Sequence, residues 1–189
     1  MRTLVIILLV LTTVCASAAK KAKAPREFVT QILEPTGGKI QRPKGWFYTE
    51  GHSGASYAWI LSREDASKAP YTTGFRIQML VGVQEGAGKT PKQFVLDYVD
   101  SKKKQAKVLK ICRENNQGMF TRVCLETEEG PHHILYSLFW GSDIDLVVVS
   151  IAGTTKELWD TYAPTFDRMN HFELIDMKHF MKRFKKNET

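Results

Sequence analysis

The sequence predicts an α+β fold in which an antiparallel β-sheet is covered by helices on both faces, as in an α/β/α sandwich. Residues 146–152 form a nearly unbroken apolar run, which predicts a strand that is buried on both of its faces. Short segments of turn-forming residues separate most of the other predicted strands, and such connections favour antiparallel pairing. Two longer segments carry apolar residues at helical spacing, so we expect them to cover the sheet.

The first eighteen residues have the pattern of a secretory signal peptide. Arg2 provides the positive charge, Leu4 to Leu11 the apolar core, and Ala16-Ser17-Ala18 the small residues of a cleavage site. The apolar core is shorter than the roughly 20 residues that a spanning helix needs. We therefore expect residues 1–18 to be removed and residues 19–27 to form a basic disordered linker of a secreted or periplasmic protein.

The net charge of +7 is concentrated at the two ends of the chain. Residues 30–176 carry 17 basic and 18 acidic side chains, so the body of the protein is nearly neutral. A surface that binds nucleic acid needs a basic patch, and residues 102–110 are the one candidate in this body. This distribution and the predicted export both disfavour nucleic acid as a partner.

The first half of the body is predicted to consist mainly of strands. We expect these strands at residues 28–33, after Pro43, at residues 56–62 and at residues 74–83. Pro43 is expected to precede its strand, because proline has no N–H to donate to a ladder. Turn residues at 34–38 and a polar loop at 63–73 separate these segments.

Thr90-Pro91 predicts the start of a helix, with Thr90 as N-cap and Pro91 at the first helical position. Its expected buried side chains are Phe94, Val95, Tyr98 and Val99, and it ends in lysines that complement the helix dipole. Two hairpins follow, pairing residues 108–114 with 119–127 and residues 132–140 with 144–152.

After the central strand, Gly153-Thr154-Thr155 is expected to form a turn before a second helix that runs from Thr155 to about Asn170. Thr154 and Glu157 have the spacing of a capping box. The helix has one apolar stripe, composed of Leu158, Trp159, Tyr162, Phe166 and Met169. Pro164 is expected to kink or split it, because proline in a helix interior costs about 3 kcal/mol.

Three segments together resemble the PsbP and Mog-type family of α/β/α sandwiches. The first is Ile40 to Trp46, which contains the sequence Pro-Lys-Gly-Trp, and the second is the helix start Thr90 to Phe94. The third is the strand that begins at Asp145, together with the following helix, which ends in Met169-Asn170-His171-Phe172. The resemblance covers most of residues 28–174. It implies an extracytoplasmic accessory protein that docks on another protein without catalysis. The family has no shared catalytic residues to transfer, and we expect no cofactor and no metal.

The last segment, residues 175–189, is predicted to be a basic amphipathic tail beyond a single domain at residues 28–174. Such a segment can bind an anionic membrane surface or a groove of an acidic partner. The alternative is a last helix that packs back on the domain, and the short length of the tail favours it. The candidate binding residues are Met177, Lys178, Phe180, Met181, Lys182, Arg183, Phe184, Lys185 and Lys186.

Cys112 and Cys124 are the two cysteines that remain after removal of the signal peptide. In an oxidising compartment a disulfide is the favoured interpretation. Their hairpin places both side chains on one face, either opposite or diagonal to one another, and a diagonal pair would be too far apart to bond. A metal site that adds His132 and His133 fits no zinc spacing, and adjacent histidines of a strand point to opposite faces.

Three other patterns suggest chemistry that their spacing does not support. Gly82 to Thr90 resembles a phosphate-binding loop, but Gly82 is one residue too far from Gly88 for that motif. Ser53 lies in a sequence like a nucleophile elbow, yet a strand rather than a helix is predicted to follow it. Asp143 and Asp145 provide too few ligands for a calcium loop.

We conclude that the sequence predicts a secreted or periplasmic, non-catalytic accessory or binding protein that docks on a protein partner. Binding of an anionic membrane surface through the C-terminal tail is the alternative. A small hydrolase that uses Ser53 is a further, less favoured hypothesis. Trp46, Trp59 and Trp140 are expected to be core residues rather than a stacking platform.

Overall fold

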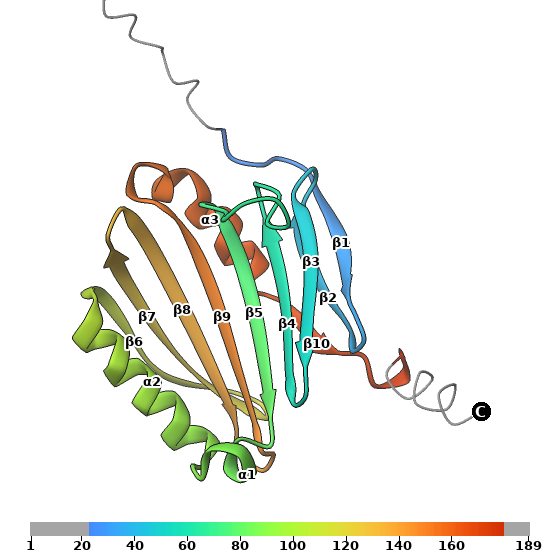
Figure 1. Ribbon diagram of the computed structural model, residues 1–189, viewed down its shortest axis with the longest axis vertical. Coiled ribbons are helices and arrows are strands. Elements are labelled where there is room, and N and C mark those ends of the chain that lie inside the picture. Colours follow the sequence, from blue (N-terminus) through green and yellow to red (C-terminus); the bar gives the residue numbers. More distant parts are fainter. Residues whose placement is uncertain (1–22, 180–189) are drawn as a thin grey trace, which may run out of the picture.

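The computed structural model describes residues 23–179. Antiparallel β-structure dominates it, with a seven-stranded sheet in the order β3-β4-β5-β9-β8-β7-β6 and a smaller sheet in the order β1-β2-β10 (Figure 1). The strands are β1 (Phe28–Leu33), β2 (Gly37–Pro43), β3 (Phe47–Ser53), β4 (Ser56–Ser62), β5 (Gly74–Val81), β6 (Lys107–Gln117), β7 (Phe120–Glu129), β8 (His132–Gly141), β9 (Leu146–Thr155) and β10 (Glu173–Ile175). The helices are α1 (Val83–Ala87), α2 (Pro91–Gln105) and α3 (Trp159–Met169), with a 3-10 turn at Lys156–Leu158 before α3.

Strand β9 lies in the middle of the large sheet and is buried on both faces. Leu146 and Val148 belong to one buried cluster, whereas Val147 and Val149 belong to the other. Among the described strands, β9 alone contributes buried residues to both clusters. The prediction of a doubly covered central strand is therefore confirmed.

Helix α2 covers one face of the sheet over β7, β8 and β9. Thr90 Oγ1 accepts a hydrogen bond from the Gln93 amide at 3.2 Å, as expected for the N-cap. Val95 and Val99 are the helix residues that are fully buried, while Phe94 and Tyr98 pack at the margins of the same cluster. Figure 1 shows the helix lying across the β6–β8 half of the sheet.

The opposite face is covered over β4, β5 and β9 by α3 together with the three-stranded sheet. Tyr162, Phe166 and Met169 of α3 are buried in the same cluster as Leu33 and Ile40 of β1 and β2. This layer is thus part helix and part strand. The predicted sandwich with helical cover on both faces is correct only in part, because β-structure supplies much of the second layer.

The connection from β9 to α3 differs from its prediction. Gly153, Thr154 and Thr155 continue β9, and α3 begins only at Trp159. The Thr154 hydroxyl forms a 2.8 Å hydrogen bond with the Thr73 hydroxyl, and both side chains are completely buried. Thr154 is therefore used inside the sheet and does not cap the helix. A kink or split was predicted at Pro164; α3 continues through this residue as one helix, so the split does not occur, and the kink stays a prediction.

Other elements were missed or misplaced by the sequence analysis. Pro43 ends β2 and pairs with Phe28 of β1. The next pair is the hydrogen-bonded one, since the Lys44 amide donates to the Glu27 oxygen at 2.9 Å, so the missing N–H of Pro43 faces away from β1 and beyond the residues that pair with β10. The short helix α1 was not predicted; Gly82 and Gly88 adopt left-handed conformations at its two ends. Strand β10 was not predicted, and three residues are too few for a periodic signal.

The Thr73–Thr154 pair provides a test of the β9 connection. We expect Thr154→Val to lower the free energy of unfolding by about 1–3 kcal/mol, because the buried Thr73 hydroxyl loses its partner. The double variant Thr73→Val/Thr154→Val removes both hydroxyls and should be more stable than the single variant. Urea unfolding measures both effects, and a double variant that is less stable than Thr154→Val would contradict this role.

Candidate functional site

The two covering layers are offset, so in the described chain most of the α3-side face of β6 and β7 has neither a helix nor a second sheet over it. The α3 layer reaches β8 at His133, which stacks on Trp159, and at Ser137, which accepts a hydrogen bond from Asn170. We call this surface the β6–β8 half-face and define it by Gln117, Phe120, Arg122, Ser137 and Phe139. These residues alternate along their strands with the residues that face α2. The half-face lies beside the C-terminal end of α3, which supplies Asn170.

A cleft of about 480 Å³ opens between this half-face and the chain that follows α3. Gln117, Phe120, Phe139 and Val148 form its floor, and residues 170–174 form its wall. The ring of Phe172 packs edge to face against Phe139, with the ring centroids 6.2 Å apart. The cleft is therefore mainly aromatic and aliphatic, with polar groups at its rim, and its volume is in the range of ligand-binding pockets.

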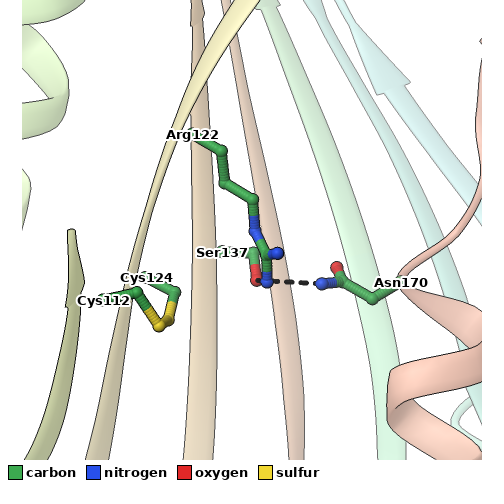
Figure 2. Close-up of a disulfide and its surroundings, with 5 residues drawn as sticks. All are labelled: Cys112, Arg122, Cys124, Ser137 and Asn170. Atoms are coloured by element: carbon green, nitrogen blue, oxygen red, sulfur yellow. Dashed lines mark hydrogen bonds between the residues drawn. A yellow bond between two sulfur atoms is a disulfide. The ribbon is translucent and has the colours of Figure 1, made fainter. Parts of the chain in front are cut away.

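A chain of hydrogen bonds runs along the side of the cleft (Figure 2). Arg122 donates from Nη2 to the Ser137 hydroxyl at 2.9 Å, and the Asn170 side-chain amide donates to the same hydroxyl at 3.1 Å. Ser150 in turn donates to Oδ1 of Asn170 at 2.9 Å. This network joins β7, β8 and β9 to the end of α3 and fixes the position of the Arg122 guanidinium.

Arg122 is a half-buried cation with unused hydrogen-bonding capacity. Its Nε is buried and has no hydrogen-bond partner, and no carboxylate of the described chain forms an ion pair with it. Burial lowers the pKa of the Arg122 guanidinium, and the more distant Asp167 partly offsets this effect. The group remains charged at neutral pH, because the ordinary pKa of arginine is above about 12.

Cys112 and Cys124 form a disulfide on the same face, one strand outward from this network (Figure 2). They are opposite in register, with their Cα atoms 4.9 Å apart, so the diagonal arrangement does not occur. Strand β6 is irregular on either side of the bond, with register shifts between Val108 and Lys110 and between Cys112 and Asn115. The disulfide thus attaches an irregular edge strand to the sheet beside the cleft.

The histidines that were considered with these cysteines are placed elsewhere. Nε2 of His133 lies 2.7 Å from Oε1 of Glu126. The His133 ring stacks on the Trp159 ring, with the ring centroids 3.7 Å apart. It therefore links β7 and β8 to the start of α3. Within residues 23–179, no group of three or more potential metal ligands comes together.

In the described part of the chain, Ser53 lies in a β-hairpin and the glycine-rich segment 82–88 contains the short helix α1. Ser53 ends β3 in a hairpin with β4, as the strand prediction for residues 56–62 requires, and no hydrogen bond joins it to a histidine there. Asp145 accepts a hydrogen bond from the Gln84 amide at 3.0 Å and so caps α1. The three tryptophans predicted to be core residues, Trp46, Trp59 and Trp140, are buried.

The basic residues 102–110 are largely paired with acids. Nζ of Lys102 lies 3.2 Å from Oε2 of Glu129, and Nζ of Lys107 lies 3.1 Å from Oε2 of Glu128. Of the predicted tail site, Met177 and Lys178 are exposed at the end of the described chain. The remaining tail candidates, Phe180, Met181, Lys182, Arg183, Phe184, Lys185 and Lys186, lie outside the described residues, as does the predicted signal peptide.

No protein-family model matches this chain, and no curated protein matches it. Among solved structures, this chain is similar to the cyanobacterial PsbP protein (CyanoP) from Synechocystis sp. PCC 6803. The sequence identity is 14% and the TM-score is 0.49, and the match covers 85% of this chain and 98% of the CyanoP chain. A protein from Bacteroides thetaiotaomicron VPI-5482 is 15% identical, with a TM-score of 0.42 over 79% of this chain and 49% of that one. The predicted PsbP resemblance thus has a counterpart among solved structures, whereas its Mog-type part finds no support. At these identities we argue function only from this chain's own residues.

Sequence reasoning missed the main residues of this site. Arg122 stands in a stretch where polar residues alternate with Val123 and Leu125, and this period-2 pattern could have placed it on the face away from α2. Nothing in the local sequence could have brought Asn170 beside it. Only the packing of α3 against the sheet joins these two residues.

The disulfide leads to a stability prediction. It closes a loop of 12 residues, and we expect the double variant Cys112→Ser/Cys124→Ser to lose about 2–3 kcal/mol of unfolding free energy. Urea unfolding of both proteins, each with and without a reducing agent, measures the loss. The reducing agent should destabilise only the unmodified protein. If the reducing agent lowers the unfolding free energy of both proteins equally, the disulfide does not contribute to stability in solution.

Proposed function

We propose that this protein is a non-catalytic accessory or binding protein of an extracytoplasmic compartment, which docks on a protein partner through the cleft of the β6–β8 half-face. The observation that carries this proposal is an apolar cleft of about 480 Å³ at the edge of the α3 layer, where the β6–β8 half-face begins. Such a cleft can take one or two large apolar side chains, the residues that typically anchor protein interfaces.

The surroundings of the cleft support a protein as the occupant. Met119 lies in the turn between β6 and β7 and is 65% exposed, next to the cleft residues Gln117 and Phe120. Its flexible apolar side chain extends the contact surface beyond the cleft itself. A partner can therefore insert an anchor between the strands and α3 and also contact the rim.

The groups around the cleft support binding in preference to catalysis. Both cysteines are joined in the disulfide, and the hydroxyls of Ser137 and Ser150 are engaged with Arg122 and Asn170. Nucleophilic catalysis needs a nucleophile within reach of a base that can accept its proton. No such pair lines the cleft in the described residues.

Filling the cleft should remove the binding that we propose. Gln117 lines the cleft from the exposed edge strand, so Gln117→Trp adds a large ring there with little cost to the core. Asn116 is its neighbour on the opposite face of β6, which makes Asn116→Trp the matched control. The probe is the neutral peptide N-acetyl-Ala-Ala-Phe-amide, and N-acetyl-Ala-Ala-Ala-amide is the reference.

We expect the phenylalanine peptide to shift amide resonances around the cleft in an NMR titration, whereas the alanine peptide should not. Gln117→Trp should weaken this binding by about tenfold or more, and Asn116→Trp should leave it unchanged. Thermal unfolding of both variants controls for stability. The docking proposal fails if the phenylalanine and alanine peptides shift the same resonances equally. It also fails if Gln117→Trp and Asn116→Trp have the same effect on the binding of the phenylalanine peptide.

Export is a separate part of the proposal. It is supported by the predicted signal peptide and by the disulfide, a bond that forms in oxidising compartments. Among the described residues, no helix has the length and apolar character needed to cross a membrane. We expect the mature protein to begin at Ala19, and mass spectrometry of its N-terminal peptide will test this. A mature protein that still carries residues 1–18 would contradict export by this signal.

A further inference from the structure

Three arginines in the described chain have a buried Nε without a hydrogen-bond partner: Arg42, Arg76 and Arg122. Arg42 donates to the backbone oxygen of Trp46, and Arg76 donates to Gln78 at 3.2 Å. Arg122 differs from the other two because it lies beside the cleft. Its position therefore bears on what the cleft can bind.

Arg122 is adjacent to the cleft through two of the lining residues, Phe139 and Asn170. Its guanidinium carbon lies 5.8 Å from the centroid of the Phe139 ring, and Phe139 forms part of the cleft floor. The Ser137 hydroxyl occupies one of the five guanidinium donors. The Nε donor is buried, so three donors remain on Nη1 and Nη2, enough for the two parallel hydrogen bonds of a carboxylate.

The charges near the cleft do not neutralise Arg122. Glu173 is the one carboxylate that lines the cleft, and its ion-pair partner is Lys39, which lies 3.6 Å from Glu173 and 3.7 Å from Asp176. Asp167 is exposed on α3 and forms no ion pair with Arg122. His171, also at the rim, has its Nδ1 2.8 Å from the backbone oxygen of Asp167. A half-buried cation without a counter-ion is favourable for an incoming anion.

We propose that Arg122 anchors the terminal carboxylate of the partner polypeptide, whose last side chain is apolar and enters the cleft. This inference rests on the proposed function, since it specifies the part of the partner that the cleft receives. A C-terminal residue carries its carboxylate and its side chain on the same α-carbon. The two groups are therefore separated by a few bond lengths, roughly 5 Å, which matches the separation of the guanidinium from the Phe139 ring.

Peptides that differ only in their carboxylate test this anchor. The probes are N-acetyl-Ala-Ala-Phe with a free carboxylate, the same peptide as its amide, and N-acetyl-Ala-Asp-Phe-amide, in which the carboxylate is on a side chain. Each is titrated against the mature protein and against Arg122→Gln by NMR. Arg76→Gln is the matched control, because it removes the same charge from a half-buried arginine on the other side of the sheet.

We expect the mature protein and Arg76→Gln to bind the free carboxylate about 10- to 100-fold more tightly than either amide peptide. Arg122→Gln should bind all three peptides with the same weak affinity, because the apolar cleft remains. Arg122→Lys should recover only part of the preference, since lysine cannot form two parallel hydrogen bonds to one carboxylate.

The possible failures are distinct. Equal binding of the free acid and its amide by the mature protein would overturn the carboxylate anchor while leaving the cleft as a docking site. Tight binding of the aspartate peptide would show that side-chain carboxylates are accepted, and this would overturn the assignment of a chain terminus. If no peptide binds, the proposed function fails together with this inference.

Discussion

The burial of β9 on both faces is the constraint on which the rest of the structure depends. A strand with apolar side chains in both directions must have a layer on each side of the sheet, because neither face can be left in contact with water. In this protein the two layers are α2 on one face, and α3 with the three-stranded sheet on the other. Val147 and Val148 are consecutive residues, yet they stabilise two separate cores.

The two layers overlap near β8 and β9 but not beyond them, and this offset creates the candidate site. The α2 layer covers β7 and β8, whereas the α3 layer covers β4 and β5. Phe120 and Phe139 therefore lie at the margin of the α3 layer, at the point where the chain leaves α3. Ser137 is buried beside them, and Arg122 and Asn170 both donate to its hydroxyl. An uncovered apolar surface next to a fixed cation is suited to receiving part of another molecule.

Features encoded within a few neighbouring residues were predictable. The start of α2 was correct because Thr90 and Pro91 act on the first turn that follows them. The strand at residues 56–62 was correct because its alternating pattern identifies β4. Predictions failed where a distant residue competed for the same group. Thr154 has the spacing of a helix cap, but Thr73, far away in the sequence, takes its hydroxyl into the sheet.

The sequence by itself determined the antiparallel strands, the central position of residues 146–152 and the presence of two amphipathic helices, because these follow from periodicity and turn chemistry. Only the tertiary structure decided how far each layer extends over the sheet, that a small second sheet completes one of them, and that Arg122 lies beside Phe139 and Asn170. The physical reason is that these arrangements depend on the fit between surfaces that are distant in the chain. Local spacing carries no information about that fit.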